Sequence, residues 1–203
     1  SCRIAFRYLS RQKDQGRGIA EKITLASQFA QADPYRAATH NKGIFNGIDA
    51  VLIATGNDWR AIGAGAHAFA SREGHYQGLS QWTLDLEREE LVGEMTLPMP
   101  VATKGGSIGL NPRVALSHEL LGNPSAKELA QLIVSIGLAQ NFAALKALVS
   151  TGIQQGHMKL QAKSLALLAG ASESEVAPLV DRLIADKTFN LETAQRYLEN
   201  LRS

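Results

Sequence analysis

The chain has 203 residues, of which 45% are apolar and 20% are charged, and its formal net charge at pH 7 is +2. These values are typical of a globular protein with a real core, and the small, dispersed charge argues against a nucleic-acid partner. The single cysteine, Cys2, excludes an internal disulfide and favours a reducing, cytoplasmic compartment, and no Cys/His cluster predicts a metal site. In the sequence, no apolar run approaches the ~18–20 residues that span a bilayer, so we expect neither a membrane segment nor a signal peptide.

The first elements are a strand and a helix. Alternation over residues 3–9 predicts a strand, and apolar residues at helical spacing over 19–32 predict a helix. The pair Asp33-Pro34 should end that helix, because the residue before proline avoids the helical conformation. A chain that opens within a strand and has no initiator methionine is expected to be the C-terminal part of a longer protein.

Two further helices are predicted before the middle of the chain. One runs over residues 42–54 with Asn41 as its N-cap, and the next runs over 59–71 with Asp58 as its N-cap. The second of these helices is rich in alanine and glycine. Its small side chains predict close packing against another element or a ligand.

The middle of the chain changes to strands. Residues 80–86 and 91–97 alternate around an acidic turn and predict an antiparallel pair. The glycine-rich loop at 104–109 lacks the spacing of a nucleotide-binding loop and is weak evidence on its own.

The rest of the chain reads as helices. A short helix is expected over 112–121, and Ser125 with Glu128 forms the capping box of a helix that runs to about Ser150. Three more helices are expected over 153–169, 172–186 and 191–201. We therefore predict an α+β fold: residues 1–151 with helices packed on a small antiparallel sheet, and residues 152–203 as a three-helix unit.

The first candidates for chemistry are Lys42 and Asp58. A lysine near the expected start of a helix faces the positive end of the helix dipole, which favours an anion beside it. Asp58 either caps a helix or pairs with Lys42, and it can do both. The alternative is that Lys42 only extends into solvent and Asp58 is only a cap.

Five other polar residues are candidates. His157, at the start of the C-terminal unit, can deliver a proton near neutral pH, although a half-exposed helical histidine is the alternative. Arg36 suits a carboxylate or phosphate, and Asn46 is a further candidate substrate contact. The pair Gln140-Asn141 interrupts an apolar helix and either satisfies a neighbouring polar group or faces a site.

The segments that hold these residues resemble 3-hydroxy-3-methylglutaryl-coenzyme A reductase, especially its bacterial second class. The resemblance covers nearly the whole chain, and several long motifs carry it in order. These are residues 33–49 (DPYRAATHNKGIFNGID), 55–67, 97–100, 137–141 and 152–160.

The resemblance implies an oxidoreductase that converts this thioester to mevalonate and coenzyme A with two hydrides from NAD or NADP, or runs in reverse. It implies that Lys42 stabilises the oxygen during hydride transfer, that Asp58 hydrogen-bonds to Lys42, and that His157 protonates the departing thiolate. It assigns substrate contacts to a set of four residues: Arg36, Asn46, Gln140 and Asn141. It also implies a homodimer with the site between subunits, and makes residues 152–203 a flap over the substrate.

The sequence also departs from the family. The family's catalytic glutamate and its nicotinamide-binding domain lie outside it, so we expect this chain to be inactive alone. The residues that choose between NADH and NADPH are outside it too, and the loop at 105–111 departs from the second-class pattern. The competing hypothesis is a catalytically inactive module that binds coenzyme A thioesters or serves as a scaffold. A plain helical interaction domain would explain only residues 152–203.

Overall fold

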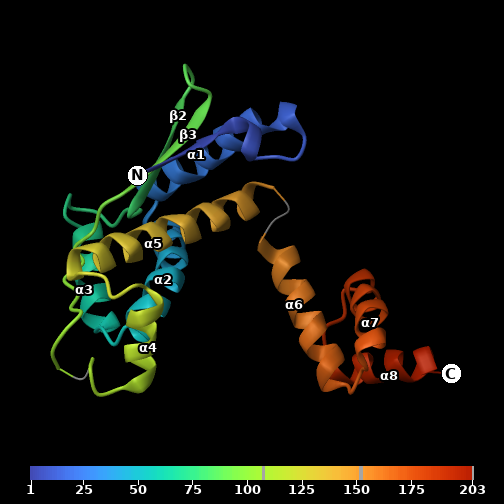
Figure 1. Ribbon diagram of the computed structural model, residues 1–203. Coiled ribbons are helices and arrows are strands. Elements are labelled where there is room, and N and C mark those ends of the chain that lie inside the picture. Colours follow the sequence, from blue (N-terminus) through green and yellow to red (C-terminus); the bar gives the residue numbers. More distant parts are fainter. Residues whose placement is uncertain (107, 151–152, 203) are drawn as a thin grey trace. The chain divides into compact units, whose positions relative to one another are not determined.

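The computed structural model describes residues 1–106, 108–150 and 153–202 (Figure 1), without the side chains of Lys13 and of residues 153–157. The chain divides into two compact units, Ser1–Ser150 and Thr151–Ser203. The predicted boundary, between residues 151 and 152, lies one residue away.

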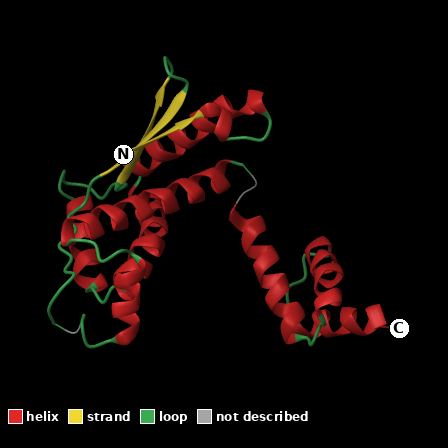
Figure 2. Cartoon of the chain, viewed as in Figure 1, coloured by secondary structure: helices red, strands yellow, loops and turns green. Residues whose placement is uncertain are grey.

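The first unit contains one antiparallel sheet, drawn in yellow in Figure 2. Its strands are β1 (Cys2–Ala5), β2 (Ser80–Asp85) and β3 (Glu90–Met95), in the order β1-β3-β2. The predicted hairpin is confirmed as β2 and β3, with Trp82 opposite Gly93. A Cβ atom on Gly93 would lie 2.5 Å from the Trp82 ring, so only glycine fits beneath this tryptophan.

The first strand is shorter than predicted. It ends at Ala5, and Phe6–Tyr8 form a single 3-10 turn, η1. Phe6 and Leu9 are both buried, which is a spacing of three that a turn satisfies and a strand does not. Burial of both Phe6 and Leu9 in the core therefore requires a turn after Ala5, so the strand ends before residue 9, where the alternating pattern predicted its end.

Helices cover this sheet and pack on one another. After a second short turn, η2 (Lys13–Gln15), they are α1 (Gly16–Ala32), α2 (Pro34–Ala54), α3 (Trp59–Ala70), α4 (Pro112–Leu120) and α5 (Ala126–Val149). Helices α1, α2 and α5 contact one another, and α1 and α5 also contact the sheet. The predicted α+β class is confirmed: helices on a small antiparallel sheet.

Helix α2 begins earlier than predicted. Asp33 caps it, since its carboxylate accepts from the backbone N–H of Arg36 at 2.6 Å, and Pro34 occupies the first turn, where its missing N–H costs nothing. The predicted cap, Asn41, is instead buried within the helix. Lys42 is therefore in the middle of α2, so the helix-dipole argument for a nearby anion is wrong.

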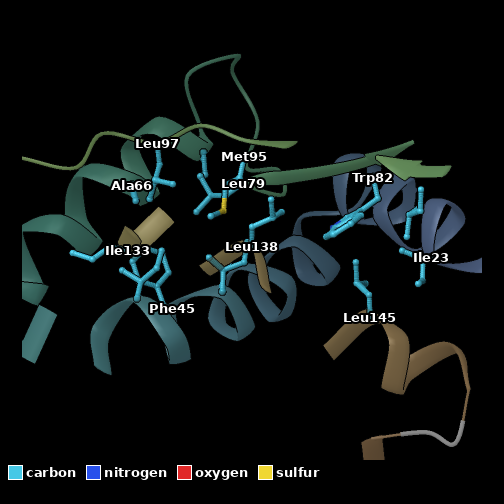
Figure 3. Packing of buried hydrophobic residues seen from close by; sticks show 14 of the residues in the cluster. Ile23, Phe45, Ala66, Leu79, Trp82, Met95, Leu97, Ile133, Leu138 and Leu145 are labelled. Carbon is cyan, nitrogen blue, oxygen red and sulfur yellow. The ribbon is translucent and has the colours of Figure 1, made fainter. Parts of the chain in front are cut away.

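The core of the first unit lies where the sheet, α2 and α5 meet. Figure 3 shows Trp82 and Met95 from the sheet, Phe45 from α2, and Ile133 and Leu138 from α5, all at most 8% exposed. Burial of such side chains stabilises a fold by roughly 1.5–3 kcal/mol each. This packing fixes the position of α2 relative to α1 and α5.

Helix α5 changes one expectation. Its 24 residues, with a mean hydropathy of 1.7 in the most apolar window, are long and apolar enough to cross a membrane. The expectation that no apolar stretch approaches this length is therefore wrong. A core helix passes the same test, and α5 packs against α1, α2 and β3, so it is weak evidence for a span.

The second unit has its own core. Its helices are α6 (Ile153–Leu168), α7 (Glu173–Ala185) and α8 (Leu191–Arg202), as predicted. Ala166 of α6, Leu179 and Leu183 of α7 and Leu198 of α8 are buried together. Glu175 accepts from the backbone N–H of Ser172 at 2.7 Å, which bears out the predicted capping box.

Candidate functional site

Helices α2 and α3 follow each other in the chain and pack together (Figure 1). Side chains of both helices line a cleft. Its volume is about 430 Å³, within the range of small-molecule sites. Helix α2 contributes Ala38, Lys42, Phe45 and Asp49; α3 contributes Trp59, Arg60, Gly63, Ala64 and His67; Tyr76 comes from the following loop. Two cations, one carboxylate and several aromatic rings therefore share one concave surface.

Lys42 enters the cleft because of its spacing on α2. Residues 38, 42, 45 and 49 recur at intervals of three and four and form one stripe of the helix. Phe45 is 8% exposed and anchors the stripe to the core, while Lys42 is exposed. No ion pair involves Lys42 within the part of the chain that is described, so its ammonium is available to a ligand.

Asp58 caps α3, as predicted. One carboxylate oxygen accepts from the backbone N–H groups of Arg60 and Ala61, at 3.1 Å each. Asp58 is exposed and is not among the cleft-lining residues, and among described residues no ion pair joins it to Lys42. Within one chain the structure does not bring the two together, and their pairing stays a prediction.

Arg36 and Asn46 lie on α2 beside the cleft stripe and not in it. Asn46 is exposed and follows Lys42 by four residues, so both project from one side of the helix. Arg36 is half-buried, and burial lowers the pKa of its guanidinium. An anionic partner would stabilise the charged form of this partly desolvated guanidinium.

Asn141 lies in the core and not at the cleft. It is 1% exposed, and its carboxamide oxygen accepts from Ser80 Oγ at 2.8 Å and from Trp82 Nε1 at 2.7 Å. Its amide nitrogen lies 3.2 Å from His40 Nε2. The structure therefore shows the alternative in which Asn141 satisfies neighbouring polar groups, while Gln140 is exposed.

His40 belongs to this core network. It is 3% exposed, its Nε2 lies 2.7 Å from Ser80 Oγ, and burial lowers its pKa to about 4, assisted by the charge of Arg36. The imidazole is therefore neutral near pH 7. The sequence pattern gave no reason to single it out.

His67 and Tyr76 were also missed from the sequence. His67 Nδ1 lies 2.8 Å from the Tyr76 hydroxyl, and the His67 ring packs 5.3 Å from the Phe45 ring between centroids. His67 could be predicted only from the packing of α2 on α3, which no motif in the sequence indicates. Tyr76 has no comparable signal, because it reaches the cleft from a loop.

Two further points concern ligands. The described residues contain no group of three or more His, Cys, Asp or Glu side chains that could hold a metal ion. The predicted acid, His157, lies on α6, and its side chain is outside the described residues.

Comparisons with known proteins agree with one another. Residues 1–162 match the family model described as hydroxymethylglutaryl-coenzyme A reductase. The chain is 49% identical over 188 residues to the 3-hydroxy-3-methylglutaryl-coenzyme A reductase of Archaeoglobus fulgidus, covering 93% of this chain and 43% of that protein.

Solved structures from Streptococcus pneumoniae are also similar. One 3-hydroxy-3-methylglutaryl-coenzyme A reductase is 94% identical with a TM-score of 0.74, covering 98% of this chain and 48% of that one. Another, a class II enzyme bound to NADPH in open conformations, is 94% identical with a TM-score of 0.73, covering 100% of this chain and 49% of that one. The chain thus spans about half the length of these relatives.

Proposed function

The chain belongs to the hydroxymethylglutaryl-coenzyme A reductase family, and we propose that it supplies the Lys42 cleft of an enzyme that interconverts 3-hydroxy-3-methylglutaryl-coenzyme A and mevalonate. The observation that carries this proposal is the position of Lys42. An unpaired ammonium lines a cleft of ligand size, within the segment that matches the family. The enzyme would act with the part of the family's length that this chain does not cover.

In the reductive direction, two hydrides and two protons convert the thioester to a primary alcohol and release coenzyme A as a thiol. Negative charge grows on the carbonyl oxygen at each hydride addition. An ammonium held against that oxygen stabilises the charge, and such electrostatic stabilisation is commonly the largest single contribution to catalysis. Lys42, on a helix fixed by its buried neighbour Phe45, is the group we assign to this task.

Other residues would complete the chemistry. We assign Asp58 to a hydrogen bond with Lys42 in the assembled enzyme, and His157 to protonation of the departing thiolate. Arg36, Asn46 and Gln140 would contact the substrate. Asn141 would act from the core, since it orients His40 on the same helix as Lys42.

The cleft suits a nicotinamide cofactor. Trp59, His67 and Tyr76 offer planar faces to a nicotinamide ring, and Arg60 offers positive charge to phosphate. When bound, the nicotinamide supplies hydride. NADPH is the form we propose, because a relative 94% identical to this chain is bound to it.

We also propose a homodimer that completes the site. The family resemblance implies this arrangement, and Asp58 is exposed and makes no ion pair with Lys42 among the described residues of one chain, which leaves its carboxylate open to a further partner in the assembled enzyme. The cytoplasmic location is supported by the single cysteine, Cys2.

The test is NADPH oxidation by the full-length protein in the presence of the thioester, with Lys42→Ala beside Lys22→Ala. Loss of an oxyanion-stabilising group should lower kcat by about 100- to 1,000-fold. Lys22 is an exposed lysine on α1 outside the cleft, and its variant should keep wild-type activity. A Lys42→Ala enzyme within a few-fold of wild type would contradict the proposal. Thioester binding without any NADPH oxidation would favour the inactive binding module instead.

A further inference from the structure

A histidine and a tyrosine form a hydrogen-bonded pair in the wall of the cleft that holds Lys42. His67 of α3 and Tyr76 of the following loop both line this cleft. The His67 Nδ1 atom lies 2.8 Å from the Tyr76 hydroxyl, and the two ring centroids are 5.9 Å apart. His67 is exposed, so a ligand can reach its imidazole, in contrast to the buried ring of His40.

The fold holds this pair in a fixed place. The His67 ring packs on the ring of Phe45 with 5.3 Å between centroids, and Phe45 is 8% exposed. The loop that carries Tyr76 is tied to α2 at its next residue, because the backbone oxygen of Gln77 accepts from Asn41 Nδ2 at 3.0 Å. A binding group that is held in this way loses little conformational freedom when a ligand arrives.

The hydrogen bond determines what the second imidazole nitrogen can do. A phenol O–H is a stronger donor than the N–H of a neutral imidazole, so the Tyr76 hydroxyl donates and His67 Nδ1 accepts. The proton of the neutral imidazole then lies on Nε2. Within the part of the chain that the structure describes, His67 makes no other hydrogen bond, and no ion pair joins it to its neighbour Asp49. The Nε2–H group is therefore left for a ligand.

An uncharged N–H group selects a particular kind of ligand atom. It suits a carbonyl oxygen, whereas Lys42 and Arg60 in the same cleft are the better partners of anionic groups. Phe45 and Ala64 in the cleft wall are apolar, and apolar surroundings strengthen a hydrogen bond by excluding water. Both ligands of the proposed reaction carry a carbonyl oxygen, the thioester in its acyl group and NADPH in its nicotinamide carboxamide.

We infer that His67 is a ligand-binding residue whose Nε2–H donates to a carbonyl oxygen of a ligand bound beside Lys42, and that Tyr76 is a positioning residue that keeps this proton on Nε2. The inference rests on the proposed function for the identity of the two ligands. It adds an uncharged donor to the two cations of the cleft.

Two substitutions separate the contact with the ligand from the contact with Tyr76. The amide of asparagine reaches the position of imidazole Nδ1, so His67→Asn keeps a polar group beside the Tyr76 hydroxyl and loses the donor to the ligand. The amide of glutamine reaches the position of Nε2, so His67→Gln keeps that donor. NADPH oxidation by the full-length protein gives kcat/KM for the thioester at saturating NADPH, and kcat/KM for NADPH at saturating thioester.

His67→Asn should lower one of these two values by about 3- to 10-fold, as expected for the loss of one hydrogen bond. His67→Gln should keep both values within about 2-fold of wild type, because its amide N–H replaces the lost donor. A fall in the value for the thioester identifies the thioester carbonyl as the acceptor, and a fall in the value for NADPH alone identifies the carboxamide.

Tyr76→Phe keeps the ring and loses the hydroxyl, so it should lower the same value by about 2- to 5-fold. The matched control is His75→Asn, at an exposed histidine outside the cleft, which should change neither value. His67 is exposed, so both of its variants should fold, and urea denaturation midpoints equal to that of wild type verify this.

The inference is wrong if His67→Asn leaves both values at the wild-type level, or if His67→Gln loses as much as His67→Asn. A purely structural role of His67 gives the reverse order, since asparagine then preserves the contact with Tyr76. A Tyr76→Phe protein with wild-type values would contradict the positioning role. Failure of the proposed function is distinct, because the wild-type protein would then oxidise no NADPH with the thioester, and both proposals would fall.

Discussion

Helix α2 carries polar side chains on two faces, and the two faces differ in how those side chains are satisfied. On the core face, the Asn41 carboxamide donates to Gln77 O at 3.0 Å and accepts from Leu79 N at 2.8 Å. On the cleft face, Lys42 is exposed and makes no ion pair within the described residues. The internally bonded Asn41 therefore helps to specify the fold, whereas the exposed ammonium of Lys42 is open to a ligand.

The largest expected effect on stability is on the core face. Asn141→Ala removes the acceptor of Trp82 Nε1 and of Ser80 Oγ, and it leaves a buried donor and a cavity. The free energy of unfolding should fall by about 3 kcal/mol. Urea denaturation of the full-length protein measures it, with Lys42→Ala expected within about 0.5 kcal/mol of wild type. Equal losses in the two variants would abolish the distinction between the faces.

Acid should also act through the core face. The pKa of His40 is lowered to about 4 in the folded state, below its ordinary value of 6.5, so the unfolded chain binds more protons between these values. Stability is therefore lost as pH falls through that window, by about 2 kcal/mol between pH 7 and pH 5. The lowered pKa of Glu175, about 2, affects stability only at lower pH.

The measurement is urea denaturation at both pH values, with His40→Gln beside His75→Gln. The first variant should lose most of this pH dependence, and the second, at an exposed histidine, should keep it. If the free energy of unfolding of His40→Gln depends on pH as strongly as that of the wild-type protein, another group causes the loss of stability in acid.

The smallest effect separates two roles of Asp58. Asp58→Ala removes the cap of α3 and should lower stability by about 1 kcal/mol, whereas Asp58→Asn retains a capping oxygen and should lower it by a few tenths. If Asp58 also pairs with Lys42 in the assembled enzyme, both variants should lose activity alike. Activity that follows stability instead, falling only in Asp58→Ala, would leave Asp58 as a cap alone.

Elements whose signal is local to the sequence were predicted correctly. Asp58 and the Ser125–Glu128 box begin α3 and α5 as predicted, because a cap needs only the residues one turn away. The start of α2 at Pro34 was not predicted. The pair Asp33-Pro34 ends α1, as expected, and it also begins α2.

The tertiary partners could not be predicted in the same way. Asn141 meets Trp82 across 59 positions of sequence, and no pattern in either segment specifies that pairing. Lys42, which lines the cleft, and Asp58, which does not, were both predicted from their motifs. His67 becomes a candidate only when α2 and α3 are known to pack together.

Gly63 has a consequence for the breadth of ligands that the cleft admits. It stands in the wall formed by α3, and a Cβ atom there would meet nothing within 4 Å, although glycine inside a helix is unfavourable by about 1 kcal/mol. The missing side chain at Gly63 keeps the cleft wide at this point, although no neighbouring atom would exclude a larger residue. A protein engineer could therefore narrow the entrance from this position, one methyl group at a time, and change ligand selectivity while every reactive group stays where it is.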